Sequence, residues 1–147
     1  ITNTGEISAS AVAGNASGEN SIVEISDVYG VYFESGVDYF DNHGTIAARV
    51  QAGDNADVSY VAGVFADEDA AVNNNGDIVA QITLGNNATV ADVSGIAVYD
   101  ATATINNSGN IYLSIDSPSV PSSVSNAAGI YIIDSTATVS NPGAVYL

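Results

Sequence analysis

Apolar and polar residues alternate with a period of two in several segments of this chain. After the Gly of the tripeptide Asn3-Thr4-Gly5, the second, fourth and sixth positions are Ile7, Ala9 and Ala11, and the residues between them are Ser8 and Ser10. The same alternation follows three of the four other tripeptides of this type. Such a pattern is typical of a β-strand with one buried face and one solvated face. It therefore predicts a strand after each tripeptide.

The tripeptide Asn-x-Gly recurs five times, and its glycines are 39, 32, 33 and 34 residues apart. A second column of glycines, each followed by Val or Ile, recurs at a similar spacing. We expect one strand to precede this second column, another to begin at it and a third to follow the tripeptide. The asparagines are Asn3, Asn42, Asn74, Asn107 and Asn141; the tripeptide glycines are Gly5, Gly44, Gly76, Gly109 and Gly143; the second column is Gly30, Gly63, Gly95 and Gly129.

A three-stranded unit of ~33 residues cannot bury its apolar face alone, but it can do so when stacked on copies of itself. The fold class we predict is all-β: a parallel β-helix (β-solenoid) of about four and a half coils, right-handed by the usual crossover rule. An immunoglobulin-like sandwich, the alternative, has no fixed long period. The chain then forms a single domain with the repeat phases 1–29 (partial), 30–62, 63–94, 95–128 and 129–147 (partial).

The asparagine and glycine columns have a structural interpretation. Asparagines stacked in turns tolerate a left-handed backbone and can hydrogen-bond to one another from coil to coil. We therefore expect the five asparagines and five glycines of the tripeptides to form a turn ladder along the solenoid.

Composition supports strands and excludes several partners. The chain has 18 Val and 14 Ile but 3 Leu, and β-branched residues favour strands. One Lys or Arg against 17 Asp and Glu gives a net charge of −16, so we expect neither nucleic acid nor an anionic membrane surface as a partner. No apolar run approaches the ~20 residues of a membrane span, and we expect no membrane insertion.

Candidate chemistry is sparse. The lone His43 shares its turn position with Thr, Asn, Ser and Pro, which favours a turn residue over a catalytic base. Asp100 and Asp134, with Glu68 in the coil before, could form the carboxylate pair of a polysaccharide hydrolase, yet we expect no enzyme. Weak structural Ca²⁺ is the one cofactor considered, with clustered oxygen ligands at Asp54, Asp57, Asp67 and Asp69.

Two further surfaces are candidates for recognition. The polar segments 14–20, 52–57, 84–89 and 116–121 occupy equivalent places in successive repeats, so we expect them to project from one edge. Outward aromatic residues, among them Tyr32, Phe65 and Tyr131, could bind glycans or neighbouring solenoids, or could simply stack on each other.

The first and last segments of the sequence, 1–7 and 139–145, lie in the same phase of the repeat, and no polar cap is recognisable in either. Solenoids usually protect their open ends with atypical capping repeats. Two explanations follow: a piece of a longer solenoid, or a homo-oligomer stacked head to tail into a filament. Stacking would involve Ile1, Ile7, Val139, Val145 and Leu147.

The recurring pattern Asn-x-Gly-x-Ile/Val, as in Asn42-His43-Gly44-Thr45-Ile46, resembles the passenger domains of bacterial autotransporters. This resemblance implies a secreted β-helix at the bacterial cell surface that serves adhesion, aggregation or biofilm formation. The leading hypothesis is an extracellular filament subunit, and the alternative is an adhesin segment that binds glycans or a host surface.

Overall fold

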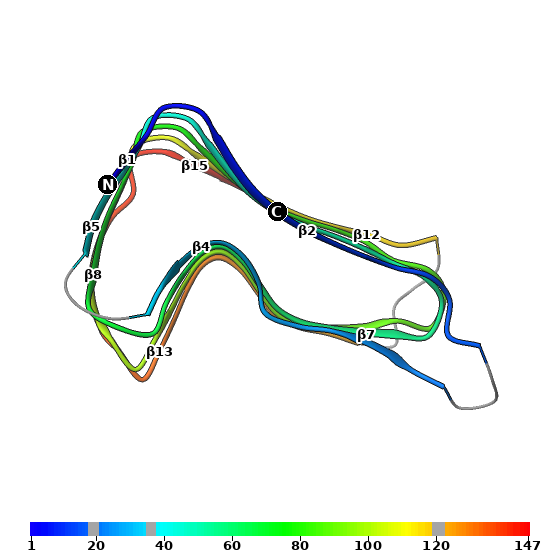
Figure 1. Ribbon diagram of the computed structural model, residues 1–147. Helices are drawn as coiled ribbons and strands as arrows, with labels where there is room; N and C mark the ends of the chain where they lie inside the picture. Colours follow the sequence, from blue (N-terminus) through cyan, green and yellow to red (C-terminus); the bar gives the residue numbers. More distant parts are fainter. Residues whose placement is uncertain (18–20, 35–37, 119–122) are drawn as a thin grey trace.

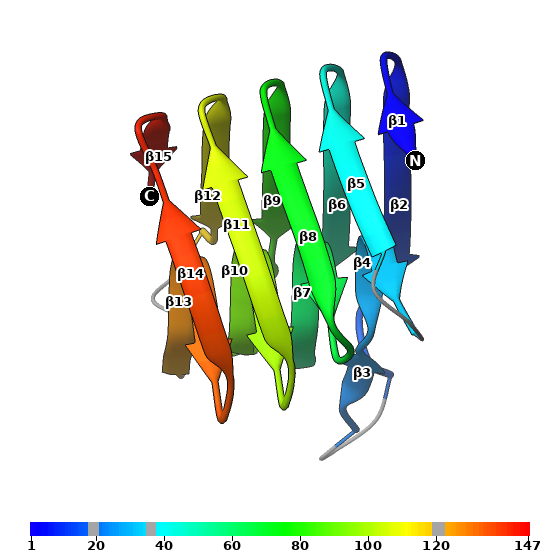
Figure 2. The same cartoon turned by 90° about the vertical axis from the view of Figure 1, so that its left-hand side faces the viewer.

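The computed structural model describes residues 1–17, 21–34, 38–118 and 123–147. These residues form a parallel β-solenoid, and none of them is helical. Figure 1 looks along the solenoid axis, where successive coils superimpose, and Figure 2 shows the coils side by side. The predicted all-β solenoid of repeating ~33-residue coils is thus confirmed.

Three parallel sheets run along the axis, each built from equivalent strands of successive coils. Sheet A consists of β1 (Thr2–Asn3), β5 (Asp38–Asn42), β8 (Ala70–Asn74), β11 (Thr102–Asn107) and β14 (Thr136–Ser140). Sheet B consists of β2 (Glu6–Ala13), β6 (Thr45–Ala52), β9 (Asp77–Thr83), β12 (Asn110–Asp116) and β15 (Ala144–Tyr146). Sheet C consists of β3 (Val23–Ile25), β4 (Val28–Phe33), β7 (Ala56–Ala66), β10 (Thr89–Tyr99) and β13 (Ser123–Ile133).

Each coil has three strands, as predicted, but the chain is divided among them differently. The segments before and after the second glycine column form one continuous strand of 11 residues, as in β7 and β10. A separate strand ends at or near the Asn of each tripeptide and belongs to sheet A. The register is nonetheless the one the repeat predicts: Ile46 pairs with Ile78, and Ile78 pairs with Ile111. All three isoleucines are fully buried.

Sheet C bends inward toward sheet B, which gives the cross-section its indented outline (Figure 1). The glycines of the second column lie where the two sheets come closest, because a Cβ on Gly63 or Gly95 would overlap the side chain of Ile78 or Ile111 in sheet B. This contact separates the interior into two apolar cores, one around Val58 and Val90 and the other around Ile78 and Ile105. The second glycine column therefore permits the close approach of two sheets.

A column of residues with a left-handed backbone lies at the bend of sheet C. Asp27, Tyr60, Asp92 and Asn126 occupy equivalent positions, and their φ angles are 60°, 52°, 53° and 50°. Asp and Asn tolerate this conformation better than other residues with a side chain. The sheet consequently changes direction at the same place in every coil.

Candidate functional site

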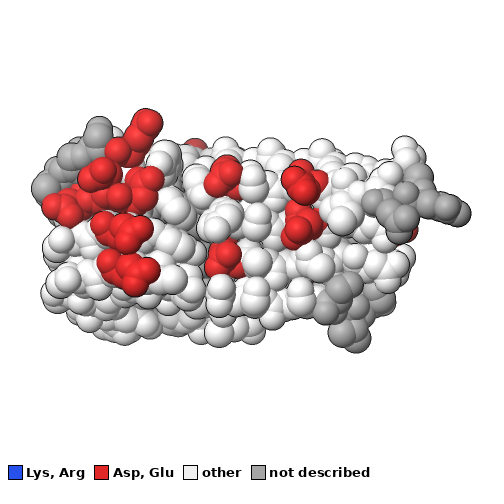
Figure 3. Space-filling view, turned by 90° about the horizontal axis from the view of Figure 1, so that it is seen from below, with Lys and Arg blue, Asp and Glu red and all other residues white. Residues whose placement is uncertain are grey.

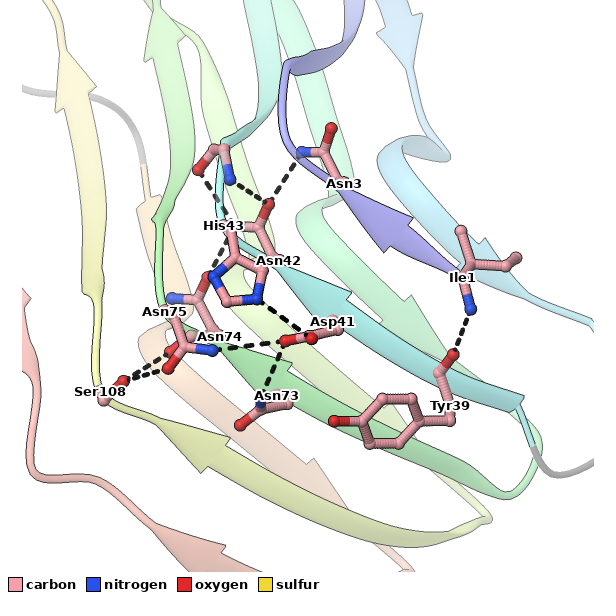
Figure 4. A network of polar contacts seen from close by, with 11 residues as sticks. Ile1, Asn3, Tyr39, Asp41, Asn42, His43, Asn73, Asn74, Asn75 and Ser108 are labelled. Carbon is pink, nitrogen blue, oxygen red and sulfur yellow. Dashed lines mark hydrogen bonds and ion pairs between the residues drawn. The ribbon is translucent and has the colours of Figure 1, made fainter.

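The asparagines of the five tripeptides form a continuous hydrogen-bonded ladder along the axis. Each Nδ2 donates to the Oδ1 of the asparagine in the next coil, with donor–acceptor distances of 2.8, 2.7, 2.6 and 2.7 Å. The three inner members, Asn42, Asn74 and Asn107, are fully buried. The predicted coil-to-coil bonding is confirmed. The left-handed backbone that asparagine tolerates in turns does not occur here, since none of the five has a positive φ. Figure 4 shows the first part of this ladder.

All bonds of the ladder point in one direction. Asn3 lies at the accepting end of the ladder. Its Oδ1 accepts a hydrogen bond from Gly5 N (3.1 Å), as Asn42 Oδ1 does from Gly44 N (3.2 Å). At the other end, Asn141 Oδ1 accepts from Asn107, while its own Nδ2 has no acceptor among the described residues. The ladder therefore presents an acceptor at one end of the solenoid and a donor at the other.

The tripeptide glycines let successive turns stack closely. A Cβ on Gly44, Gly76, Gly109 or Gly143 would overlap the carbonyl oxygen of the glycine in the preceding coil. A Cβ on Gly5, which belongs to the first coil, would meet nothing within 4 Å. A further coil placed before the first one at the same spacing would put its own carbonyl oxygen into this empty space beside Gly5.

The last coil leaves core-type side chains open at the end of the solenoid. Val124, Val139 and Val145 are 48%, 42% and 37% exposed, whereas their partners one coil before, Val90, Ile105 and Ile111, are 1%, 0% and 0% exposed. In the first coil, Ile25, Val28 and Phe33 stay buried, and the ring of Phe33 packs edge-on against Phe40 at 6.1 Å. The last coil thus exposes inward valines, whereas the apolar side chains that the first coil exposes most are Ile1 (78%), Val12 (76%) and Ile22 (65%).

The other residues predicted to lie at the ends are placed there. Ile1 and Leu147 are largely exposed, and Ile7 is half-buried on the inward face of β2. The amino group of Ile1 donates to the carbonyl oxygen of Tyr39 in the next coil over 2.8 Å (Figure 4).

The four acids considered for Ca²⁺ are not brought together. Asp54 and Asp57 lie at one end of β7, and Asp67 and Asp69 follow its other end. Each accepts a hydrogen bond from the protein; Asp69, for example, accepts one from the backbone N of Thr102 at 2.9 Å. No group of three or more acids or histidines with metal-binding geometry exists in the described part of the chain.

The residues considered for catalysis have backbone or turn roles in the structure. Asp100 and Asp134 have φ angles of 49° and 48°, so this column of aspartates occupies the left-handed turns that follow β10 and β13. His43 is half-exposed in its turn, with Nε2 3.1 Å from Asp41 Oδ2 (Figure 4). Asn73 donates to the same carboxylate at 2.8 Å, and this bond, assisted by His43 and Asn75, lowers the pKa of Asp41.

The predicted loop edge contains a hollow of about 450 Å³ where sheet B turns into sheet C. Its lining is mostly polar and comes from three coils; it consists of Ser21, Ile22, Asn55, Ala56, Asp57, Asn87 and Thr89. Asn55 and Asn87 have positive φ angles, which marks them as turn residues. Residues 18–20 of the first polar segment and 119–121 of the fourth lie outside the described residues.

A second hollow lies on the outer face of sheet C at its bend, and its lining includes Tyr32 and Phe65, two of the outward aromatic residues that the sequence singles out. Aromatic rings stack there along the axis: Tyr29 on Phe65 at 4.3 Å and Phe65 on Tyr99 at 5.2 Å between ring centroids. Tyr29 donates to Asp27 at 2.9 Å, and Tyr32 donates to Asp67 at 2.5 Å. Burial and then the bond to Asp27 raise the pKa of Tyr29, and the bond to Asp67 raises the pKa of Tyr32 to about 12.

Acidic side chains accompany this face of the molecule. Figure 3, which views sheet C from outside, shows most of them gathered on one side, over the turns that lead from sheet C to sheet A. Asp67, Glu68, Asp69, Asp100 and Asp134 belong to these turns. The one Arg of the chain, Arg49, lies on sheet B and pairs with Glu6 at 3.3 Å. Nothing cationic therefore offsets the acids near the bend in the described residues.

Comparisons with family models, curated proteins and solved structures found no match to this chain. Among the described residues, no helix is long and apolar enough to cross a membrane.

Proposed function

We propose that this chain is a structural subunit that stacks head to tail, coil on coil, into an extracellular filament of the bacterial surface. The observation that carries the proposal is the open last coil, whose Val124, Val139 and Val145 would be buried by one more coil. Burial of such side chains is favourable, at about 25 cal/mol per Å² of apolar surface. The extracellular, bacterial setting rests on the resemblance of the repeat to autotransporter passenger domains.

The polarity of the solenoid favours head-to-tail stacking over a symmetric pair. Asn141 Nδ2 of one copy would donate to Asn3 of the next and so continue the ladder in its own direction. Parallel sheets likewise continue only when the last coil of one copy faces the first coil of another. Contacts of this heterologous type generate open filaments.

The junction has one geometric peculiarity. Sheets A and B have five levels of strands, whereas sheet C has four, because β3 and β4 lie end to end beside β7. If β14 and β15 of one copy pair with β1 and β2 of the next, sheet C misses one strand at each junction. The subunit repeat is then about 24 Å, five strand spacings. Alternatively, β1 and β2 of one copy could take the place of β14 and β15 of the other. Each subunit would then contribute four levels to every sheet, and the repeat would be four strand spacings, about 19 Å.

Electron microscopy and fibre diffraction of the purified chain test the proposal. We expect filaments with an axial repeat near one of these two values and a strong reflection near 4.8 Å along the fibre axis. The sharpest variant is Gly5→Ala, because its methyl group meets nothing within the chain but would collide with the Gly143 carbonyl of a stacked copy. We expect it to fold normally and to lose assembly.

Two results would contradict head-to-tail stacking. One is a monodisperse monomer at millimolar concentration and physiological salt, which would favour a coil supplied by a longer chain. The other is a Gly5→Ala protein that assembles as well as the parent chain.

The loop edge favours a second candidate function, recognition of neutral glycans. Its hollow combines amide, hydroxyl and carboxylate groups of Asn55, Asn87, Thr89 and Asp57, which suit the hydroxyl groups of a sugar. A glycan array would test this function; selective binding that Asn87→Asp preserves and Thr89→Val abolishes would support it, and the absence of any selective signal would contradict it.

A further inference from the structure

The hollow at the bend of sheet C has a volume of about 350 Å³, lies on the first two coils and is separate from the loop edge. Four aromatic rings and two carboxylates line it, and they come from the first two coils: Asp27, Tyr29, Tyr32, Tyr60, Phe65 and Asp67. The bend and its left-handed backbone at Asp27 and Tyr60 create the concavity. It is therefore a feature of the fold and not of one side-chain conformation.

The lining is negatively charged, and one of its carboxylate oxygens lacks a hydrogen-bond donor within the described part of the chain. Tyr32 and Tyr60 are 45% and 41% exposed, so parts of their rings are accessible. Asp67 Oδ2 accepts the Tyr32 hydroxyl, but Asp67 Oδ1 is buried and accepts no hydrogen bond among the described residues. Buried polar atoms without a partner are rare in folded proteins and indicate a missing donor.

We propose that this hollow binds the ammonium group of an organic cation, such as a polyamine or a lysine side chain. Aromatic rings attract cations through their negative faces, and carboxylates add charge and hydrogen-bond acceptors. An ammonium group in the hollow would offset the charge of the Asp67 carboxylate, whose Oδ1 accepts no hydrogen bond among the described residues. With a net charge of −16 and its one Arg on sheet B, the chain also concentrates cations around it.

A neutral sugar fits the hollow less well, although aromatic residues often bind sugars. Sugar binding uses open ring faces, and here Tyr29, Phe65 and Tyr99 cover one another's faces in a stack. Anionic ligands are disfavoured by both carboxylates. An ammonium group needs only one accessible ring and one carboxylate, which Tyr32 or Tyr60 and Asp67 provide.

NMR titration of the ¹⁵N-labelled chain tests the proposal with spermine, tetralysine and cellohexaose as probes. Spermine represents a free polyamine, and tetralysine represents lysine side chains of a peptide. We expect both to shift amide signals around the bend and cellohexaose to shift none. Asp67→Asn removes the charge but keeps an acceptor for Tyr32, and Tyr60→Asn removes a ring at a position where Asn126 shows that Asn fits. Asp116→Asn, on sheet B, is the control with the same loss of charge.

We expect Asp67→Asn to weaken spermine binding about fivefold and Tyr60→Asn about threefold, while Asp116→Asn changes it less than about twofold. Unchanged spectra away from the substituted site would show that the variants fold. Equal effects of Asp67→Asn and Asp116→Asn would indicate diffuse attraction and overturn the proposal. Binding of cellohexaose as tight as that of spermine would also overturn it.

Discussion

Replacement of Asn74 by Ala tests whether the asparagine ladder holds the solenoid together. Asn74 is fully buried; it accepts from Asn42 at 2.7 Å, donates to Asn107 at 2.6 Å and donates to the Gly76 carbonyl at 3.1 Å. The substitution removes all three bonds and leaves Asn107 Oδ1 without its ladder donor. An unsatisfied buried polar group costs about 1–3 kcal/mol, so the loss of two ladder bonds should lower the free energy of unfolding by about 2–6 kcal/mol.

Urea unfolding followed by far-UV circular dichroism measures this change as a lower midpoint at an unchanged m-value. Asn141→Ala is the matched control, because Asn141 is exposed and takes part in a single ladder bond; its cost should stay below about 1 kcal/mol. Asn74→Asp separates hydrogen bonding from packing, since a carboxylate of the same shape cannot donate to Asn107. Two results would refute a stabilising ladder. One is an equal loss of unfolding free energy for Asn74→Ala and Asn141→Ala, and the other is an Asn74→Asp substitution that leaves the unfolding free energy unchanged.

Three other predictions follow from the same structure. Gly76→Ala should lower the free energy of unfolding by more than about 3 kcal/mol, since its Cβ overlaps the Gly44 carbonyl, whereas Gly5→Ala should stay within about 0.5 kcal/mol; urea midpoints compare them. Filament formation, measured by light scattering, should increase between 10 and 150 mM NaCl, because the Debye length falls from about 30 Å to about 8 Å and screens the repulsion between chains of charge −16. The folded pKa of Tyr32 is raised from 10.0 to about 12, so its contribution to stability is present below pH 10 and is lost as the pH rises toward 12; Tyr32→Phe should flatten the urea midpoint over this window.

Much of the fold could be predicted because each coil repeats the same physical requirement. Inward β-branched residues such as Ile46, Ile78 and Ile111 form one buried column, and a one-residue slip would turn them outward, so the sequence period defines the register. The asparagine ladder follows from the same argument, because identical residues at identical positions must lie one above another. Left-handed turns are present in other columns, such as the one that contains Asp27, Tyr60, Asp92 and Asn126.

The outward aromatic residues Tyr32 and Phe65 could be predicted, but the bend of sheet C and the concavity beside them could not, for two reasons. The left-handed column contains Tyr60 among Asp27, Asp92 and Asn126, and a tyrosine hides a pattern that is otherwise typical of Asp and Asn. The repeat pattern predicts strands that start at the glycines of the second column, whereas these glycines lie within continuous strands that pass close to sheet B. Glycine within a strand indicates close backbone approach, and that signal was available in the sequence.

The unusual charge of the chain has part of its origin in this backbone geometry. Of the eight described residues other than glycine with positive φ, four are aspartates: Asp27, Asp92, Asp100 and Asp134. Aspartate suits such turns for the same reason as asparagine, but every coil that uses it adds a negative charge to the face of sheet C. A stack of coils therefore accumulates charge along its axis while its interior stays apolar. If subunits stack as proposed, repulsion between them would oppose assembly. Screening by salt and neutralisation by cations bound at the bend would both weaken this repulsion.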